Sequence, residues 1–159
     1  KDRSGRTSLH IACINNTSID VVSKLIEAGG KKFVLAKNYS GITSLHTAVR
    51  YNASIDVISY LIEVGGKELV LAKNEYGETS LYVALHSASN DVVLKLIEVG
   101  KEALVLATDN YGKTSLHTAV EYHASNDVVL NLTEVGKEAL MQNPRSSAVE
   151  FYLPPLFPE

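Results

Sequence analysis

Apolar residues recur along the chain with the spacing of short amphipathic helices. In the segment after Gly41, Leu45, Ala48 and Val49 fall at positions i, i+3 and i+4 and would share one helix face. Thr43 stands just before them, where its hydroxyl can accept a free backbone N–H at a helix start. The pattern predicts a first helix over about residues 43–51.

A second apolar stripe follows after a short loop. Ser54 is placed to cap a second helix, and Gly65 is expected to end it, because glycine tolerates the left-handed conformation that closes many helices. The segment 67–72 is then expected to form a turn that connects to the next copy. The buried stripe comprises Val57, Ile58, Leu61 and Ile62.

This two-helix unit occurs four times. The motif copies are Gly5–Ala12, Gly41–Ala48, Gly77–Ala84 and Gly112–Ala119, so the spacings between their glycines are 36, 36 and 35. A fixed period of this size is typical of a stacked array. We expect repeats at about 2–37, 38–73, 74–108 and 109–141, and we expect Gly29, Gly100 and Gly136 to close the other second helices. The third copy is one residue shorter, and the loop between its helices is expected to absorb the difference.

The segment 142–159 departs from the repeat and contains all four prolines of the chain. Proline cannot continue a helix, so an atypical C-terminal tail is expected. Four alternatives stay open for it. It caps the last repeat, docks on a neighbouring molecule and so drives self-association, lacks order, or is a segment added to the protein.

Composition and charge narrow the function. Apolar residues are 45% and charged residues 21% of the chain, which is ordinary for a folded protein, and the net charge of -3 argues against a nucleic-acid partner. No apolar run is long enough to span a membrane, and no apolar leader is visible at the start. Cys13 is the single cysteine, so no internal disulfide can form. These features predict an intracellular, cytoplasmic location.

The motif Thr43-Ser44-Leu45-His46-Thr47-Ala48 resembles the T-P-L-H-x-A core of the ankyrin repeat family, with serine in place of proline. The segment from Val21 to Gly29 is similar to the second helix of that family. The resemblance covers about residues 2–141 and implies an all-α solenoid of four ankyrin-like repeats, each a turn plus an antiparallel helix pair. The copies here are longer than the usual 33 residues.

The recurring histidines are the first candidates for chemistry. The period places His10, His46 and His117 one repeat apart, and the third copy has Tyr82 at this position, which disfavours a metal or catalytic site. The resemblance implies that they bond the backbone and the capping threonine. Cys13 aligns with three predicted core positions, so a buried hydrophobe is favoured over a nucleophile. We expect no enzyme activity, cofactor or metal. The positions aligned with Cys13 are Val49, Leu85 and Val120.

The resemblance further implies that the turn tips and the exposed sides of the first helices line a concave groove that binds a protein or peptide. The mapped positions are rich in tyrosine, which is common at protein interfaces. The alternative is a structural spacer or scaffold segment of a longer array, such as an adaptor, a channel cytoplasmic domain or an effector, with no local ligand. The predicted partner-binding residues are Tyr39, Ile42, Arg50, Tyr51, Glu75, Tyr76, Glu78, His86, Tyr111, Lys113, Glu121 and Tyr122.

Overall fold

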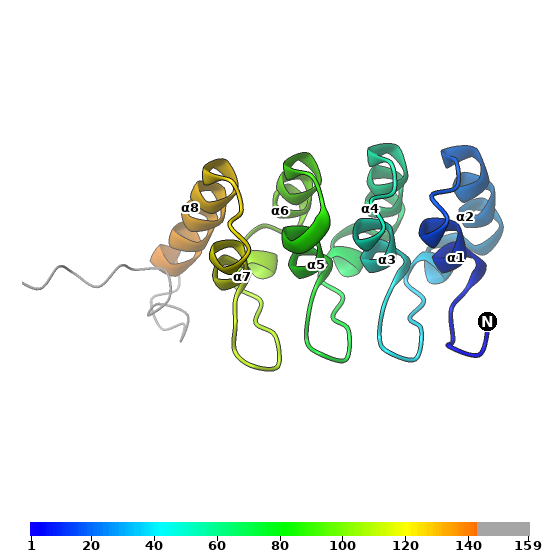
Figure 1. Cartoon of the computed structure of the whole chain (residues 1–159), viewed down its shortest axis with the longest axis horizontal. Coiled ribbons are helices and arrows are strands. Elements are labelled where there is room, and N and C mark those ends of the chain that lie inside the picture. Colours follow the sequence, from blue (N-terminus) through cyan, green and yellow to red (C-terminus); the bar gives the residue numbers. More distant parts are fainter. Residues whose placement is uncertain (143–159) are drawn as a thin grey trace, which may run out of the picture.

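The computed structural model describes residues 1–142 of the chain, and all of its regular elements are helices (Figure 1). Two isolated β-bridges, Lys37–Thr43 and Thr108–Thr114, are the nearest approach to a strand in that range. The elements are α1 (Ser8–Ile14), α2 (Ile19–Val34), α3 (Ser44–Arg50), α4 (Ile55–Val70), α5 (Ser80–Ser87), α6 (Asn90–Val105), α7 (Ser115–Glu121) and α8 (Asn126–Gln142).

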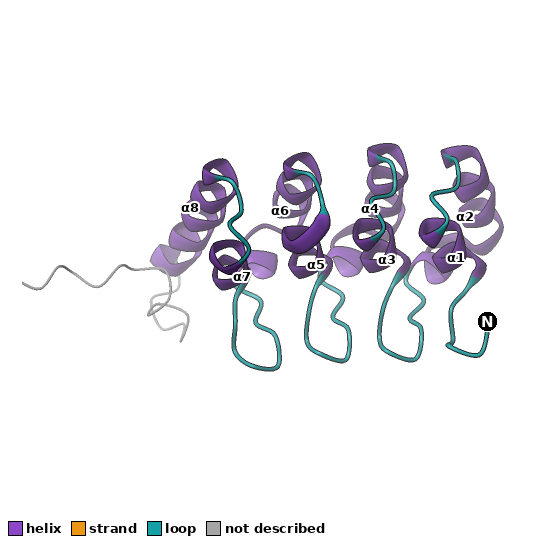
Figure 2. Ribbon diagram, in the orientation of Figure 1, coloured by secondary structure: helices purple, strands orange, loops and turns teal. Residues whose placement is uncertain are grey.

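The helices form consecutive antiparallel pairs that stack side by side. The short helices α1, α3, α5 and α7 make one row, the long helices α2, α4, α6 and α8 a second, and the turns between pairs project together on one side (Figure 2). The expected all-α solenoid is confirmed. Gln142 belongs to α8 rather than to the tail. The tail alternatives concern residues 143–159, which lie outside the described part of the chain.

Each short helix begins where the sequence predicts. Thr43 is the N-cap of α3, and its hydroxyl accepts a hydrogen bond from the backbone N–H of His46 at 3.4 Å. In the turn before it, the Asn38 side-chain oxygen accepts from the backbone N–H groups of Ser40 and Ile42 at 3.0 and 2.9 Å. These bonds satisfy backbone donors that the turn and the helix start would otherwise leave free.

The expectation that Gly65 ends the second helix is wrong by one residue. The residue that leaves helical geometry in α4 is Gly66, with φ 64° and ψ -161°, and the equivalent residue in α2 is Gly30. After the break the chain resumes one more helical turn, up to Val70. The predicted connecting turn is therefore a kinked extension of the long helix.

The glycines that were expected to end the long helices are required there because of their small size, and not because of a left-handed conformation. Gly65 is buried and helical, and a Cβ atom added to it would lie 2.5 Å from the Leu69 side chain. At Gly100 the same atom would lie 2.4 Å from Leu104. These positions therefore need glycine because the helical turn after the kink folds back onto them.

The third and fourth copies have one glycine fewer at this point. In α6 the break falls on Lys101, with φ 50° and ψ -145°, a region that residues other than glycine rarely adopt. α8 instead continues through Gly136 to Gln142, so the expectation that Gly136 closes this helix is also wrong. Lys137 keeps a negative φ where the other three copies break.

A single hydrophobic core runs through the stack. Leu9, Leu45 and Leu81 of the short helices are fully buried, and Cys13 is 1% exposed, as its alignment predicts. Val120 contradicts that alignment, because it is 61% exposed. It lies in the last helix pair, where no further pair covers it within the described residues.

The shorter third copy is accommodated at the end of a short helix. α3 is followed by Asn52 in the left-handed region, with φ 52°, and Asn16 follows α1 with φ 49°. In the third copy no such residue is present, and α5 runs one residue further to Ser87. The helix thus lengthens slightly while the loop shortens.

Candidate functional site

The histidine of the repeated motif is a structural link. His46 is buried, its Nδ1 atom lies 2.8 Å from the Thr43 hydroxyl, and its Nε2 atom lies 3.2 Å from the carbonyl oxygen of Glu78 in the next turn. A carbonyl can only accept, so Nε2 carries the proton and Nδ1 accepts from the threonine hydroxyl. The ring therefore joins one repeat to the next.

Burial holds this imidazole neutral. Desolvation lowers the pKa of His46 to about 4, and the hydrogen bond to the Glu78 carbonyl offsets this only in part. His10 has the same partners one repeat earlier, Thr7 at 2.8 Å and the Ile42 carbonyl at 2.9 Å, and burial lowers its pKa as well. The structural role that the family resemblance implies for these residues is confirmed.

Tyr82, which replaces the histidine in the third copy, makes the contact to the next turn but not the contact to the hydroxyl of the capping threonine. Its hydroxyl donates to the carbonyl of Lys113 in the following turn. It provides no acceptor for Thr79, whose fully buried hydroxyl has no hydrogen-bond partner within the described structure. The third repeat is therefore joined to the fourth but lacks the internal bond between cap and ring.

The turns are also tied together along the stack. The Nζ atom of Lys37 donates to the carbonyl of Lys73 at 2.7 Å, and Lys73 donates in the same way to Thr108. The backbone N–H of Glu75 donates to Ser40, and that of Asn110 donates to Tyr76. These bonds hold successive turns at a fixed spacing, so the surface beside them is preorganised.

We call the surface formed by the turn tips and the exposed sides of the short helices the groove face. It contains a first hollow of about 390 Å³ across the first, second and third helix pairs. Its apolar lining residues are Ile14, Ile42 and Val83, and Tyr51 also lines it. The remaining lining residues are polar or basic, namely Ser4, Arg6, Asn38, Ser40, His46, Thr47, Arg50 and Asn74.

A second hollow adjoins the first towards the C-terminal end. It is lined by Arg50, Glu78, Tyr82, Val83, His86 and Ser87. Arg50 and Val83 line both hollows, so the two adjoin, and we call them together the groove. Arg50 is exposed, and among the described residues no carboxylate lies within ion-pair distance of it.

The groove brings together five of the twelve predicted partner-binding residues, which are Ile42, Arg50, Tyr51, Glu78 and His86. The other seven lie outside the two hollows. Thr47, Val83 and Tyr82 line the groove but are absent from the prediction. Thr47 and Val83 stand one helical turn before Arg50 and His86, so helical periodicity could have identified them.

The seven predicted residues outside the hollows are either exposed at the turn tips or in contact with other side chains near the last helix pair. Tyr39, Tyr76 and Tyr111 are exposed at the turn tips. In the last pair, Lys113 forms an ion pair with Glu121 at 2.8 Å, and the Tyr122 ring lies against the His86 ring with centroids 3.6 Å apart. Glu75 is exposed at its tip.

Charge divides the groove face into two halves. In the turns and short helices of the first two pairs, basic residues outnumber acidic ones, whereas in the last two pairs the acidic residues predominate. The first half contains Lys1, Arg3, Arg6, Lys37 and Arg50 against Asp2. The second half contains Glu75, Glu78, Asp109 and Glu121 against Lys73 and Lys113.

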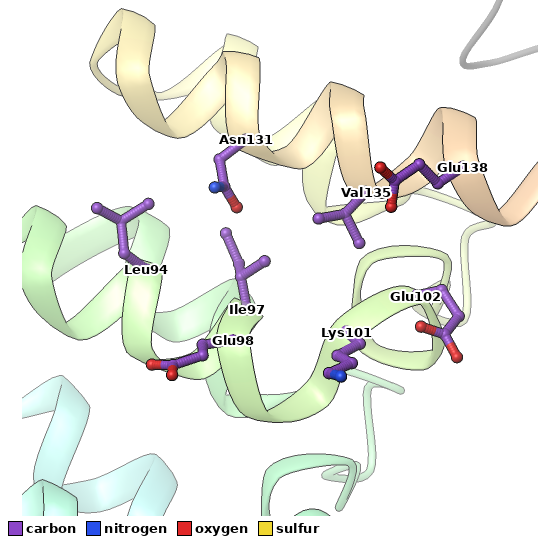
Figure 3. Close-up of a pocket in the computed structure, with 8 residues that line it drawn as sticks. All are labelled: Leu94, Ile97, Glu98, Lys101, Glu102, Asn131, Val135 and Glu138. Atoms are coloured by element: carbon purple, nitrogen blue, oxygen red, sulfur yellow. The ribbon is translucent and has the colours of Figure 1, made fainter.

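A further hollow lies between the long helices α6 and α8 (Figure 3). Ile97 and Val135 point into it, and Glu98, Glu102 and Glu138 stand around its edge. It occurs where α6 bends at Lys101 while α8 continues straight. We therefore attribute this hollow to the different courses of the two helices.

The described residues contain no group of three or more His, Cys, Asp or Glu side chains placed to hold a metal ion. Burial raises the pKa of the Cys13 thiol to about 12, so this side chain stays protonated and unreactive at neutral pH. Within residues 1–142, none of the helices has both the length and the apolar character that crossing a membrane requires.

Comparison with known proteins agrees with this architecture. No curated protein matches the chain. Residues 1–71 match a family model described as ankyrin repeats (3 copies). That segment contains the first two helix pairs, with the threonine caps and the histidine links described above. Residues 1–71 are therefore identified as ankyrin repeats by their similarity to that family.

Proposed function

We propose that this protein is a non-catalytic binding module whose groove takes up a segment of another protein. Ankyrin repeats are in general protein–protein interaction modules and non-catalytic. The observation that carries the proposal is the pair of adjoining hollows across three helix pairs, lined by both apolar and polar side chains. Recognition sites commonly combine these features.

The twelve predicted residues divide into two groups under this proposal. The five that line the groove would contact the bound segment directly, with Tyr51 and Ile42 supplying apolar area and Arg50 a charge. The exposed tip residues would stand at the rim, where contacts contribute less energy and mainly exclude water. Because the hydrogen bonds between turns already hold the groove, little ordering would oppose binding.

A pair of matched variants tests this proposal. Ser87→Arg places a long side chain in the second hollow, and Ser59→Arg makes the same change on the outer helix α4. Proteins retained from an extract of the source cells by the immobilised wild type should also be retained by Ser59→Arg and lost with Ser87→Arg. Equal retention by the two variants, with equal thermal unfolding, would contradict the use of the groove.

A further inference from the structure

We propose that the segment bound in the groove is acidic, and that a carboxylate of that segment pairs with Arg50 beside an apolar side chain seated between Tyr51 and Val83. This inference rests on the proposed function and specifies its ligand. It concerns a short extended stretch of polypeptide, because the groove follows the stack across three successive helix pairs.

The first support is the charge of the first hollow. Among the described residues, the charged side chains that line it are Arg6 and Arg50, and no carboxylate of this part of the chain does. The guanidinium of Arg6 is already engaged, since its Nε atom donates to Asp2 at 2.7 Å. Arg50 has no such partner within the described structure, so its planar group is available for a bidentate carboxylate contact.

The second support is what surrounds Arg50. The apolar residues Ile14, Ile42 and Val83 line the same hollow as Arg50, and so does Tyr51, which follows it directly in sequence. A carboxylate contact beside such surface is partly shielded from water, so the contact is stronger than on an open surface. The arrangement therefore favours an acidic residue next to an aliphatic one.

The charges on the rest of the groove face indicate how the bound segment is oriented along the groove. Beyond Arg50 the second hollow contains Glu78, whose Oε2 atom accepts from Asn74 at 2.8 Å. Glu75 belongs to the same turn as Glu78, and Glu121 belongs to the last helix pair. An acidic residue is thus repelled from the C-terminal half and attracted to the N-terminal half. The ligand's acidic residues should lie over the first two helix pairs, and neutral or basic residues over the last two.

Selection from a library of random dodecapeptides displayed on phage tests the inference. The full chain serves as bait as the wild type, as Arg50→Gln and as Arg3→Gln, the last being a matched control because Arg3 is exposed at a turn tip outside the hollows. We expect wild type and Arg3→Gln to enrich sequences with Asp or Glu beside an aliphatic residue, and Arg50→Gln to lose that enrichment.

The result distinguishes the carboxylate contact at Arg50 from the more general proposal that the groove binds a protein segment. Enriched peptides without an acidic preference, or an acidic preference that Arg50→Gln retains, overturn the carboxylate assignment and leave the groove as a binding site. Absence of any enrichment above the bare support contradicts the groove function as well.

A synthetic peptide from the selection gives the quantitative test. Arg50→Gln in the protein, or Glu→Gln in the peptide, should each raise the dissociation constant about tenfold, as expected for loss of a charged hydrogen bond. The two changes together should raise the dissociation constant no further than either change alone, because they remove the same contact. Additive effects would place the carboxylate elsewhere and overturn its assignment to Arg50.

Discussion

At the scale of single residues, the link between neighbouring repeats depends on one ring and one threonine. In the second copy both contacts of His46 are made, within the repeat to Thr43 and across to Glu78. In the third copy the Tyr82 hydroxyl donates across to Lys113, and the Thr79 hydroxyl has no hydrogen-bond partner among the described residues. The same capping threonine is therefore partnered in one copy and unpartnered in the other.

This difference predicts opposite effects for two equivalent substitutions. Thr43→Val removes the hydroxyl that His46 needs, and it should lower the free energy of unfolding by about 1–3 kcal/mol. Thr79→Val removes a buried hydroxyl that bonds to nothing described, and it should leave stability unchanged or raise it. Urea denaturation of both variants measures this, and equal losses would show that the Thr79 hydroxyl is bonded after all.

The buried histidines also predict a dependence of stability on pH. The pKa of His46 is about 4 in the folded protein and about 6.5 in the unfolded chain, so between these values the unfolded chain binds a proton that the folded one does not. Stability is therefore complete above about pH 6.5 and falls as the pH decreases. From about pH 7 to about pH 5, His46 should account for a loss of about 2 kcal/mol. His10 acts in the same direction.

Urea denaturation at several pH values checks this expectation. His46→Gln should be less stable than wild type at pH 7, because it breaks the link, but its stability should vary less between about pH 7 and about pH 5. An unchanged pH slope in this variant would show that other groups cause the loss.

At the scale of elements, the long helices differ in how they accommodate their last turn. α2 and α4 break at Gly30 and Gly66, α6 breaks at Lys101, and α8 does not break. A lysine with φ 50° and ψ -145° costs of the order of 1–3 kcal/mol, which the surrounding packing must offset.

This strain predicts that Lys101→Gly stabilises the protein by about 1 kcal/mol, because glycine adopts the conformation without the steric cost. The reverse change, Gly66→Lys, should destabilise it by a similar amount, although a Cβ atom at Gly66 has open space around it. Thermal unfolding of the two variants is the measurement. A less stable Lys101→Gly would indicate that the lysine side chain makes a contact of greater value than the strain.

The helices themselves could be predicted from sequence, and their breaks could not. Apolar periodicity and the cap residues placed the start of α3 correctly. Of two adjacent glycines, however, the pattern cannot tell which supplies the positive φ and which leaves room for Leu69, since that depends on how the next turn packs. The exposure of Val120 was also missed, because an aligned position is buried only where a neighbouring pair covers it.

At the scale of the whole molecule, the stack places side chains from three helix pairs along one groove. Ile42 and Arg50 come from the second pair, and Val83 and His86 come from the third. The sequence predicted this face through the family resemblance, yet it did not separate groove from rim. Tyr51 lines a hollow and Tyr111 does not, a distinction that follows from the path of the turns rather than from residue type.

The groove is the site at which we propose that this protein binds its partner. The most direct measurement replaces Tyr51, in the first hollow, with the photo-crosslinking residue benzoylphenylalanine, and makes the same replacement at Tyr60 on the outer helix α4. Irradiation in the source cells should give crosslinked adducts from position 51 and none from position 60. Adducts from position 60 alone, or in equal yield from both positions, would contradict the account.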